Sequence, residues 1–95
     1  MAYIYLVHTT GKMYKVGYTN NIQRRQREYN THNPNAHIVE CIELANETQG
    51  RLCESIAHDE IEVLYNSREW FKPNTRTFHL NDLICLANSI VIKVR

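Results

Sequence analysis

The sequence predicts an α+β fold in which a three-stranded antiparallel sheet is flanked by helices, in the order ββαβα with one more helix at the C-terminus. Two observations predict the sheet: two segments rich in aromatic and β-branched residues frame a short turn, and a third segment alternates apolar with polar residues. Apolar residues at helical spacing in the remaining segments predict the helices. A chain of 95 residues has the size of one domain, which we assign to residues 1–95.

The first two strands form a hairpin. Residues 3–7 and 13–18 are the strand segments, and residues 10–12, with a central glycine, form the turn. A three-residue loop fixes the following pairs: Thr9 with Met13, Val7 with Lys15, and Tyr5 with Gly17. Tyr5 and Lys15 then share one face of the sheet, on which the glycine opposite Tyr5 leaves room for a ligand.

The first helix covers Ile22–Asn30. Polar residues that offer N-cap side chains precede it: Thr19, Asn20 and Asn21. Arg25 and Tyr29 share a stripe with the isoleucine at the helix start, so both are expected to point toward the rest of the domain. Arg24 and Arg27 are turned outward.

A loop at Asn33–Asn35 leads to a third strand over His37–Leu44. The second helix covers Glu47–Tyr65. Its apolar stripe is expected to contain Leu52, Ile56 and Val63, widened by Cys53, Ala57 and Leu64. Glu54 and His58 lie along one edge of that stripe.

An aromatic connection over Arg68–Asn74 follows the second helix. Trp70 and Phe71 are expected to close the core against that helix, with base stacking as the alternative use of these rings. Apolar residues at helical spacing then predict a final helix from Asp82 to about Val94.

Charge is unevenly distributed, although the net charge is only +1. Residues 12–27 contain five basic residues and no acidic one, whereas residues 40–62 contain seven carboxylates and a single arginine. The molecule should therefore have a basic pole and an acidic pole. The outward cations that would contact nucleic acid are Lys12, Arg24 and Arg27. A solvated helix face is the alternative interpretation of this patch.

The cysteines and the apolar stretches argue against three classes of protein: disulfide-rich, zinc-binding and membrane-spanning proteins. Cys41, Cys53 and Cys85 lack CxxC spacing and nearby histidines, which argues against a disulfide framework or a zinc site and favours buried, reduced thiols. The longest apolar stretch, residues 83–94, is too short and too polar to span a bilayer, and no basic segment precedes an apolar one at the N-terminus. We expect a soluble protein of the cytoplasm, or of the host-cell cytoplasm if the source is viral.

The segment Tyr3–Tyr5, followed by Lys15–Thr19, resembles the paired strand motifs of the GIY-YIG nuclease superfamily. That superfamily continues with an arginine and, four residues later, a histidine or tyrosine on a short helix, and with a glutamate on a later helix. These places match Arg25, Tyr29 and Glu54. The resemblance covers roughly residues 2–74.

A phage-associated branch with small domains is similar to this chain at Glu54–His58 and at Arg68–Phe71. Two departures from the superfamily pattern occur, because Tyr3 stands in place of glycine and Lys15 in place of tyrosine. Some members, including active restriction enzymes, share this lysine and also have tyrosine at the place of Tyr29. The departures therefore remain compatible with activity.

The resemblance implies a metal-dependent endonuclease that hydrolyses a phosphodiester of nucleic acid, DNA in the first place, with a single Mg²⁺ or Mn²⁺. The implied catalytic residues are Tyr5, Lys15, Arg25, Tyr29 and Glu54. Among them Glu54 is the metal ligand, Arg25 holds the phosphate, and Tyr5 is general base or proton relay, with Lys15 favouring its phenolate. His58 is either a partner behind the metal ligand or a structural histidine.

Two other functions stay open at this point. One is a catalytically weak or silent GIY-YIG-fold module that binds nucleic acid through the basic patch. The other is a structural protein with no nucleic-acid partner. No recognition module is visible in the sequence, so target choice is expected to come from loops, from a homodimer or from a partner protein.

Overall fold

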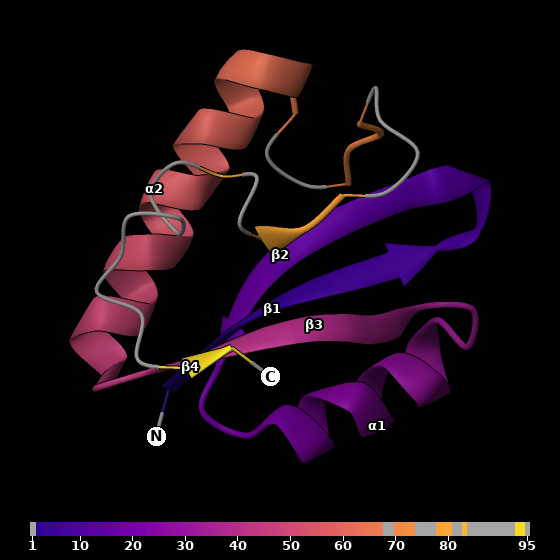
Figure 1. Cartoon of the computed structure of the whole chain (residues 1–95). Helices are drawn as coiled ribbons and strands as arrows, with labels where there is room; N and C mark the ends of the chain where they lie inside the picture. The colour runs from indigo at the N-terminus through magenta and orange to yellow at the C-terminus, as the bar shows by residue number, and fades with distance from the viewer. Residues whose placement is uncertain (1, 68–69, 74–77, 81–82, 84–92, 95) are drawn as a thin grey trace.

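The computed structural model of the chain describes residues 2–67, 70–73, 78–80, 83 and 93–94. It contains one antiparallel sheet with strand order β2-β1-β3-β4, flanked by two helices, which confirms the α+β class (Figure 1). The elements are β1 (Ala2–Thr9), the 3-10 turn η1 (Thr10–Lys12), β2 (Met13–Thr19), α1 (Ile22–His32), β3 (His37–Leu44), α2 (Glu47–Tyr65) and β4 (Lys93–Val94).

The hairpin has the predicted register. Its turn is tight because Gly11 and Lys12 both adopt left-handed backbone conformations, with φ of 77° and 58°. The strands pair as the loop length predicted: Thr9 with Met13, Val7 with Lys15, and Tyr5 with Gly17. Every side chain of the hairpin is therefore on its expected face.

The rest of the sheet differs from the three regular strands that the sequence predicted. A register shift between Leu6 and Val7 leaves Val39 as an extra residue in β3. At the other end of β3, Ile42 and Glu43 pair with the short strand β4, where the final helix was predicted to end. That part of the prediction was wrong, because the open edge of β3 offers pairing groups to this segment. Residues 84–92, which carry the rest of that prediction, lie outside the described residues.

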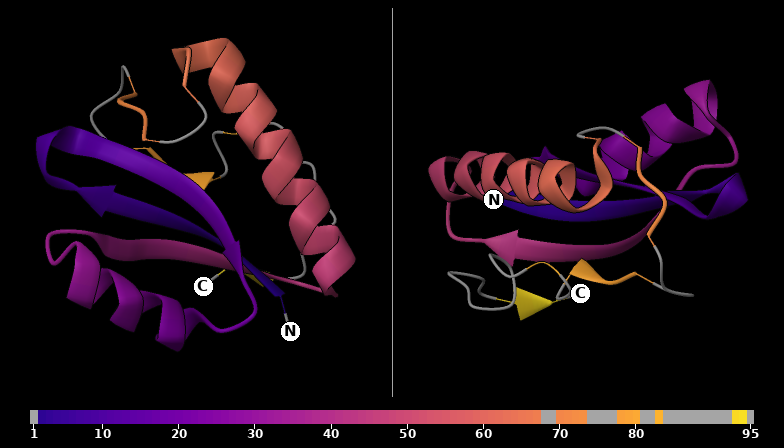
Figure 2. Two further views of the ribbon diagram at one scale, coloured as in Figure 1. Left: turned by 180° about the vertical axis from the view of Figure 1, so that it is seen from behind. Right: turned by 90° about the horizontal axis from the view of Figure 1, so that it is seen from above.

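Both helices begin at an asparagine N-cap. The side-chain oxygen of Asn21 accepts a hydrogen bond from the backbone N–H of Arg24 at 3.0 Å, so one of the three predicted cap candidates fills that role. Asn46 does the same for Gln49 at 2.9 Å at the start of α2. α1 lies along β3, whereas α2 runs beside β1 and β2 (Figures 1 and 2).

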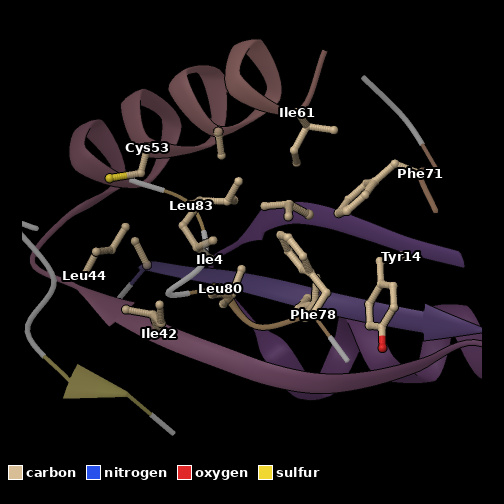
Figure 3. Packing of buried hydrophobic residues seen from close by; sticks show 14 residues of the cluster. Ile4, Tyr14, Ile42, Leu44, Cys53, Ile61, Phe71, Phe78, Leu80 and Leu83 are labelled. Carbon is tan, nitrogen blue, oxygen red and sulfur yellow. The ribbon is translucent and has the colours of Figure 1, made fainter. Parts of the chain in front are cut away.

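The main core lies between α2 and one face of the sheet (Figure 3). α2 buries a row of mostly small residues there: Gly50, Cys53, Ala57 and Ile61. The predicted stripe was right at Cys53 and Ala57, which are buried, and wrong at its other members, which are exposed: Leu52 (53%), Ile56 (41%), Val63 (84%) and Leu64 (56%). Small residues allow the helix backbone to approach the sheet closely. This close approach, and not the size of the apolar side chains, determines which face of α2 is buried.

The opposite face of the sheet carries a second, smaller cluster beneath α1. Its buried members are Tyr5, Val7 and Ala36, with Ile22, Tyr29, Ile38, Cys41 and Trp70 packed against them. Phe71 lies in the main core as predicted, but Trp70 does not. The residues that sequence analysis proposed for chemistry on β1 and α1 therefore share this second cluster.

Cys41 and Cys53 are free thiols, in agreement with the sequence, and burial raises the pKa of the Cys53 thiol above its ordinary value. Cys85 lies outside the described residues. Within the described part of the chain, neither helix combines the length and the apolar character needed to cross a membrane.

Candidate functional site

Tyr5 lies flat across Gly17 on the α1 side of the sheet. The two residues are directly paired in the hairpin, and a Cβ on Gly17 would overlap the phenol ring of Tyr5. The room that the sequence assigned to a ligand is therefore filled by this ring, which is only 1% exposed. Glycine is needed here so that the phenol can lie against the backbone of β2.

Arg25 and Tyr29 approach the same phenol from α1. Nη1 of Arg25 donates a hydrogen bond to the hydroxyl oxygen of Tyr5 at 3.0 Å, and the hydroxyls of Tyr5 and Tyr29 lie 3.4 Å apart. The two tyrosine rings meet edge to face, with centroids 6.3 Å apart. The structure thus brings together three of the five predicted catalytic residues, each on the element that the sequence indicated.

The phenol of Tyr5 resists ionisation. Burial raises its pKa well above the ordinary value of 10.0, and the hydrogen bond with Tyr29 raises it further, while Arg25 acts in the opposite direction without compensating. Lys15, which was expected to lower this pKa, is not among the groups that shift it, and desolvation outweighs the lowering effect of Arg25. In this environment Tyr5 is a neutral hydrogen-bonding group.

The guanidinium of Arg25 is only partly satisfied. Oε1 of Glu28 lies 3.0 Å from its Nε, out of line with the N–H, so the contact is an ion pair without a hydrogen bond. Nε is buried and has no hydrogen-bond acceptor among the described residues. A pocket of about 190 Å³, lined by Arg25, Glu28, Tyr29 and His32, opens beside it. A buried donor next to a pocket favours an incoming acceptor such as a phosphate oxygen.

Lys15 belongs to the same face, because its pairing with Val7 places it two pairs along the hairpin from Tyr5 and Gly17. Its Nζ lies 5.8 Å from the centre of the Trp70 ring, a cation–π contact. The ammonium therefore lies beside the indole on the face of the sheet that carries Tyr5.

α2 carries Glu54 and contacts β2 on both sides of it along the helix. Gly50, Glu54 and His58 are spaced by four residues and form one row on the helix. At one end of the row a Cβ on Gly50 would overlap the ring of Tyr18, and at the other end Nε2 of His58 lies 2.8 Å from the carbonyl oxygen of Val16. Both ends of the row therefore touch β2.

Glu54 lies in the middle of this row, between the contacts that Gly50 and His58 make with β2, on the helix that covers the face of the sheet opposite Tyr5. Its side chain is half-buried. No hydrogen bond or ion pair engages its carboxylate among the residues that the structure describes. His58 is a structural partner of β2 in this arrangement, since a carbonyl only accepts and the imidazole Nε2–H donates.

A model of the T5orf172 domain matches residues 2–91 of the chain, nearly its whole length. The chain belongs to the T5orf172 family. T5orf172 is a phage-associated domain linked to nucleic-acid-binding and nuclease modules. Comparison of this T5orf172 chain with curated proteins and with solved structures gave no significant match.

The predicted nucleic-acid contacts of the T5orf172 chain are exposed but lie on two elements. Lys12 is in the hairpin turn, while Arg24 and Arg27 are on α1. Arg24 donates from Nη2 to Asn20 at 3.2 Å, and Arg27 lines a groove between α1 and β3. None of these cations belongs to the cluster of Tyr5.

Within the described ranges, no three histidine, cysteine or acidic side chains gather closely enough to hold an ion. A carboxylate such as that of Glu54 fits Mg²⁺ or Mn²⁺ as a single protein ligand, with water and a substrate phosphate as the remaining ligands. Such a site suits a hard cation and not zinc.

Sequence reasoning missed several residues of the site. Glu28 had a recognisable signal, because it follows Arg25 by three residues on a helix. Gly50 had a weaker one, as a lone glycine inside a helical pattern. Gln26 had none: its side chain bonds the backbone N–H of Ile38 at 2.8 Å and ties α1 to β3.

Proposed function

We propose that this T5orf172 domain is a GIY-YIG-type endonuclease that hydrolyses a DNA phosphodiester with one Mg²⁺ or Mn²⁺. The observation that carries the proposal is the contact of Arg25 and Tyr29 with the Tyr5 hydroxyl above Gly17. Phosphodiester cleavage needs a cation for the phosphate, groups that order the attacking water, and charge neutralisation at the leaving oxygen. Together with Glu54, these residues can supply all three.

Arg25 is the phosphate-binding residue in this scheme. Its buried Nε–H lacks an acceptor among the described residues, and a phosphate oxygen in the adjoining pocket would satisfy it. The ion pair with Glu28 keeps the guanidinium from turning away while the substrate is absent. The planar fork of arginine suits two phosphate oxygens better than a lysine would.

Tyr5 and Tyr29 order the attacking water. The hydroxyl oxygen of Tyr5 accepts a hydrogen bond from Arg25, so the hydroxyl proton of Tyr5 remains available for Tyr29 or a water molecule. Because its pKa is raised, we assign Tyr5 to orientation and proton relay by a neutral hydroxyl, and not to a standing phenolate. Lys15, on the same face, adds positive charge where the phosphate becomes more negative.

Glu54 would hold the divalent cation as its one protein ligand. When bound there, the cation acts as a Lewis acid and stabilises the departing oxygen. His58 positions Glu54 by fastening α2 to the carbonyl of Val16 at 2.8 Å. One carboxylate suffices for this role, because Mg²⁺ retains several waters in its octahedral shell.

A supercoiled-plasmid assay with the Glu54→Gln variant tests the proposal. The wild type should nick the plasmid in Mg²⁺ or Mn²⁺, and the variant should lose this activity by about two orders of magnitude or more while it still binds DNA. Binding by the wild type without any cutting in either metal would instead support the alternative, a nucleic-acid-binding module that is catalytically silent. Absence of binding even at low salt would exclude both functions.

A further inference from the structure

Trp70 is held on the same face of the sheet as Tyr5 by a bridge at the β2 edge. Phe71 and Tyr14 exchange two backbone hydrogen bonds of 2.8 Å, so this short segment runs as an extra strand beside β2. Consecutive residues of a strand point to opposite faces. Phe71 enters the main core, and Trp70 consequently joins Tyr5 and Val7 on the α1 side.

The indole borders the site on the side away from α1. β1 is the middle strand between β2 and β3, α1 packs on β3, and Trp70 packs at the β2 edge. Arg25 and Trp70 thus flank the phenol of Tyr5 from opposite sides. The carbonyl of Trp70 accepts a hydrogen bond of 2.9 Å from the hydroxyl of Ser67, which fixes the backbone that carries the ring.

The surroundings of Trp70 differ from those of a core aromatic residue. Phe71 is 2% exposed, whereas Trp70 is only half-buried, with the Lys15 ammonium 5.8 Å from the ring centre. An accessible indole next to a cation combines the two features that bind single-stranded nucleic acid: a surface for stacking and a charge for the backbone.

We infer that Trp70 and Lys15 form a nucleotide subsite in which the indole stacks on a nucleobase next to the phosphate held by Arg25. This inference rests on the proposed nuclease function and adds a substrate class to it. A base inside a duplex already uses both of its faces for stacking on its neighbours, so the base at Trp70 is unpaired. The preferred substrate is therefore single-stranded DNA, or DNA with a flap or frayed end beside the cut.

Trp70 is the single tryptophan of the chain, so its own fluorescence reports the contact. Wild-type protein is titrated, in a chelator that prevents cutting, with a fluorophore-labelled single-stranded oligonucleotide and with an abasic oligonucleotide of equal length and charge. Anisotropy of the label gives the dissociation constant for each. We expect the indole emission to be quenched by the base-bearing strand and not by the abasic strand.

Two variants provide a matched comparison in the same binding assay. Trp70→Leu, which keeps an apolar side chain, should weaken binding of the base-bearing strand by about 5- to 150-fold, the range of base–aromatic stacking energies at tenfold per 1.4 kcal/mol. It should leave binding of the abasic strand unchanged. Trp70→Phe, which keeps an aromatic ring, should fall between wild type and Trp70→Leu, and thermal melting confirms that each variant is folded.

Three outcomes overturn the inference, and they differ in what they leave standing. If base-bearing DNA binds and is cut in Mg²⁺ without quenching the indole, the subsite is refuted and the nuclease function remains. If Trp70→Leu weakens both strands equally, Trp70 is only a structural residue. If the wild type neither binds nor cuts either oligonucleotide or a duplex, the proposed function fails and the inference fails with it.

Discussion

Replacing Gly17 with alanine tests how tightly the site is built. The added Cβ would overlap the buried ring of Tyr5, which α1 covers from above through Arg25 and Tyr29. The ring has no open direction in which to move, so the variant must distort the hairpin or the helix. Overpacking of this kind costs about 1–3 kcal/mol. At roughly 4–8 °C per kcal/mol for a domain of this size, about 2 kcal/mol lowers the melting temperature by about 8–16 °C.

Gly50→Ala is the matched control for this experiment. Its Cβ also overlaps a tyrosine ring, that of Tyr18, but the Tyr18 hydroxyl bonds the exposed side chains of Glu47 and Arg51, so the ring can swing outward with them. Alanine also gains about 1 kcal/mol of helix propensity over glycine, so the net change should stay within about 1 kcal/mol. Circular dichroism melts of both variants measure the difference.

A double-mutant cycle then identifies the cause of the loss. In a Tyr5→Leu background the Gly17→Ala change should cost little, because the ring that it overlaps is gone, and the coupling energy should approach about 2 kcal/mol. The packing argument would be refuted if Gly17→Ala melted like the wild type. It would also be refuted if its loss persisted undiminished in the Tyr5→Leu background.

Three further predictions concern charge and protonation. Because the Tyr5 pKa is raised above 10.0, the contribution of this residue to folding stability is complete below pH 10 and is lost as the pH rises further. Above pH 10, urea unfolding should show the wild type losing stability more steeply than Tyr5→Phe, by up to about 1.4 kcal/mol per pH unit. Equal dependence of stability on pH in the two proteins would contradict this. Arg25→Lys should cut plasmid about 100-fold more slowly in a single-turnover assay, and unchanged cutting would remove Arg25 from the site. Removing Arg24 and Arg27 together should lower the slope of log binding constant against log salt by roughly two, whereas an unchanged slope would show that neither contacts phosphate.

The parts of the fold that sequence predicted correctly depend on local rules. Loop length and side-chain alternation fixed the pairing of Tyr5 with Gly17 without any knowledge of the third strand. Helical spacing alone predicted that Arg25 and Tyr29 face the same side as Ile22, and the structure confirms that both reach Tyr5. Asn21 was among the expected caps for the same reason, since capping depends on the first turn only.

The parts that sequence did not predict depend on contacts between distant segments. The buried face of α2 follows from the close approach of Gly50 to Tyr18, and a pattern weighted by side-chain size chose Leu52 and Val63 instead. Trp70 lies on its face of the sheet because its neighbour Phe71 forms a bridge to Tyr14 of β2. The local sequence pattern cannot reveal that bridge. The raised pKa of Tyr5 likewise arises from burial under α1, a property of the assembled fold.

A crystal soaked in Mn²⁺ and measured for anomalous scattering tests the central claim most directly. One manganese peak should lie about 2.0–2.3 Å from a carboxylate oxygen of Glu54, and it should vanish in Glu54→Gln crystals. If the wild type shows no peak at Glu54 while it cuts DNA in Mn²⁺, the carboxylate is not the metal ligand and the proposed mechanism is wrong.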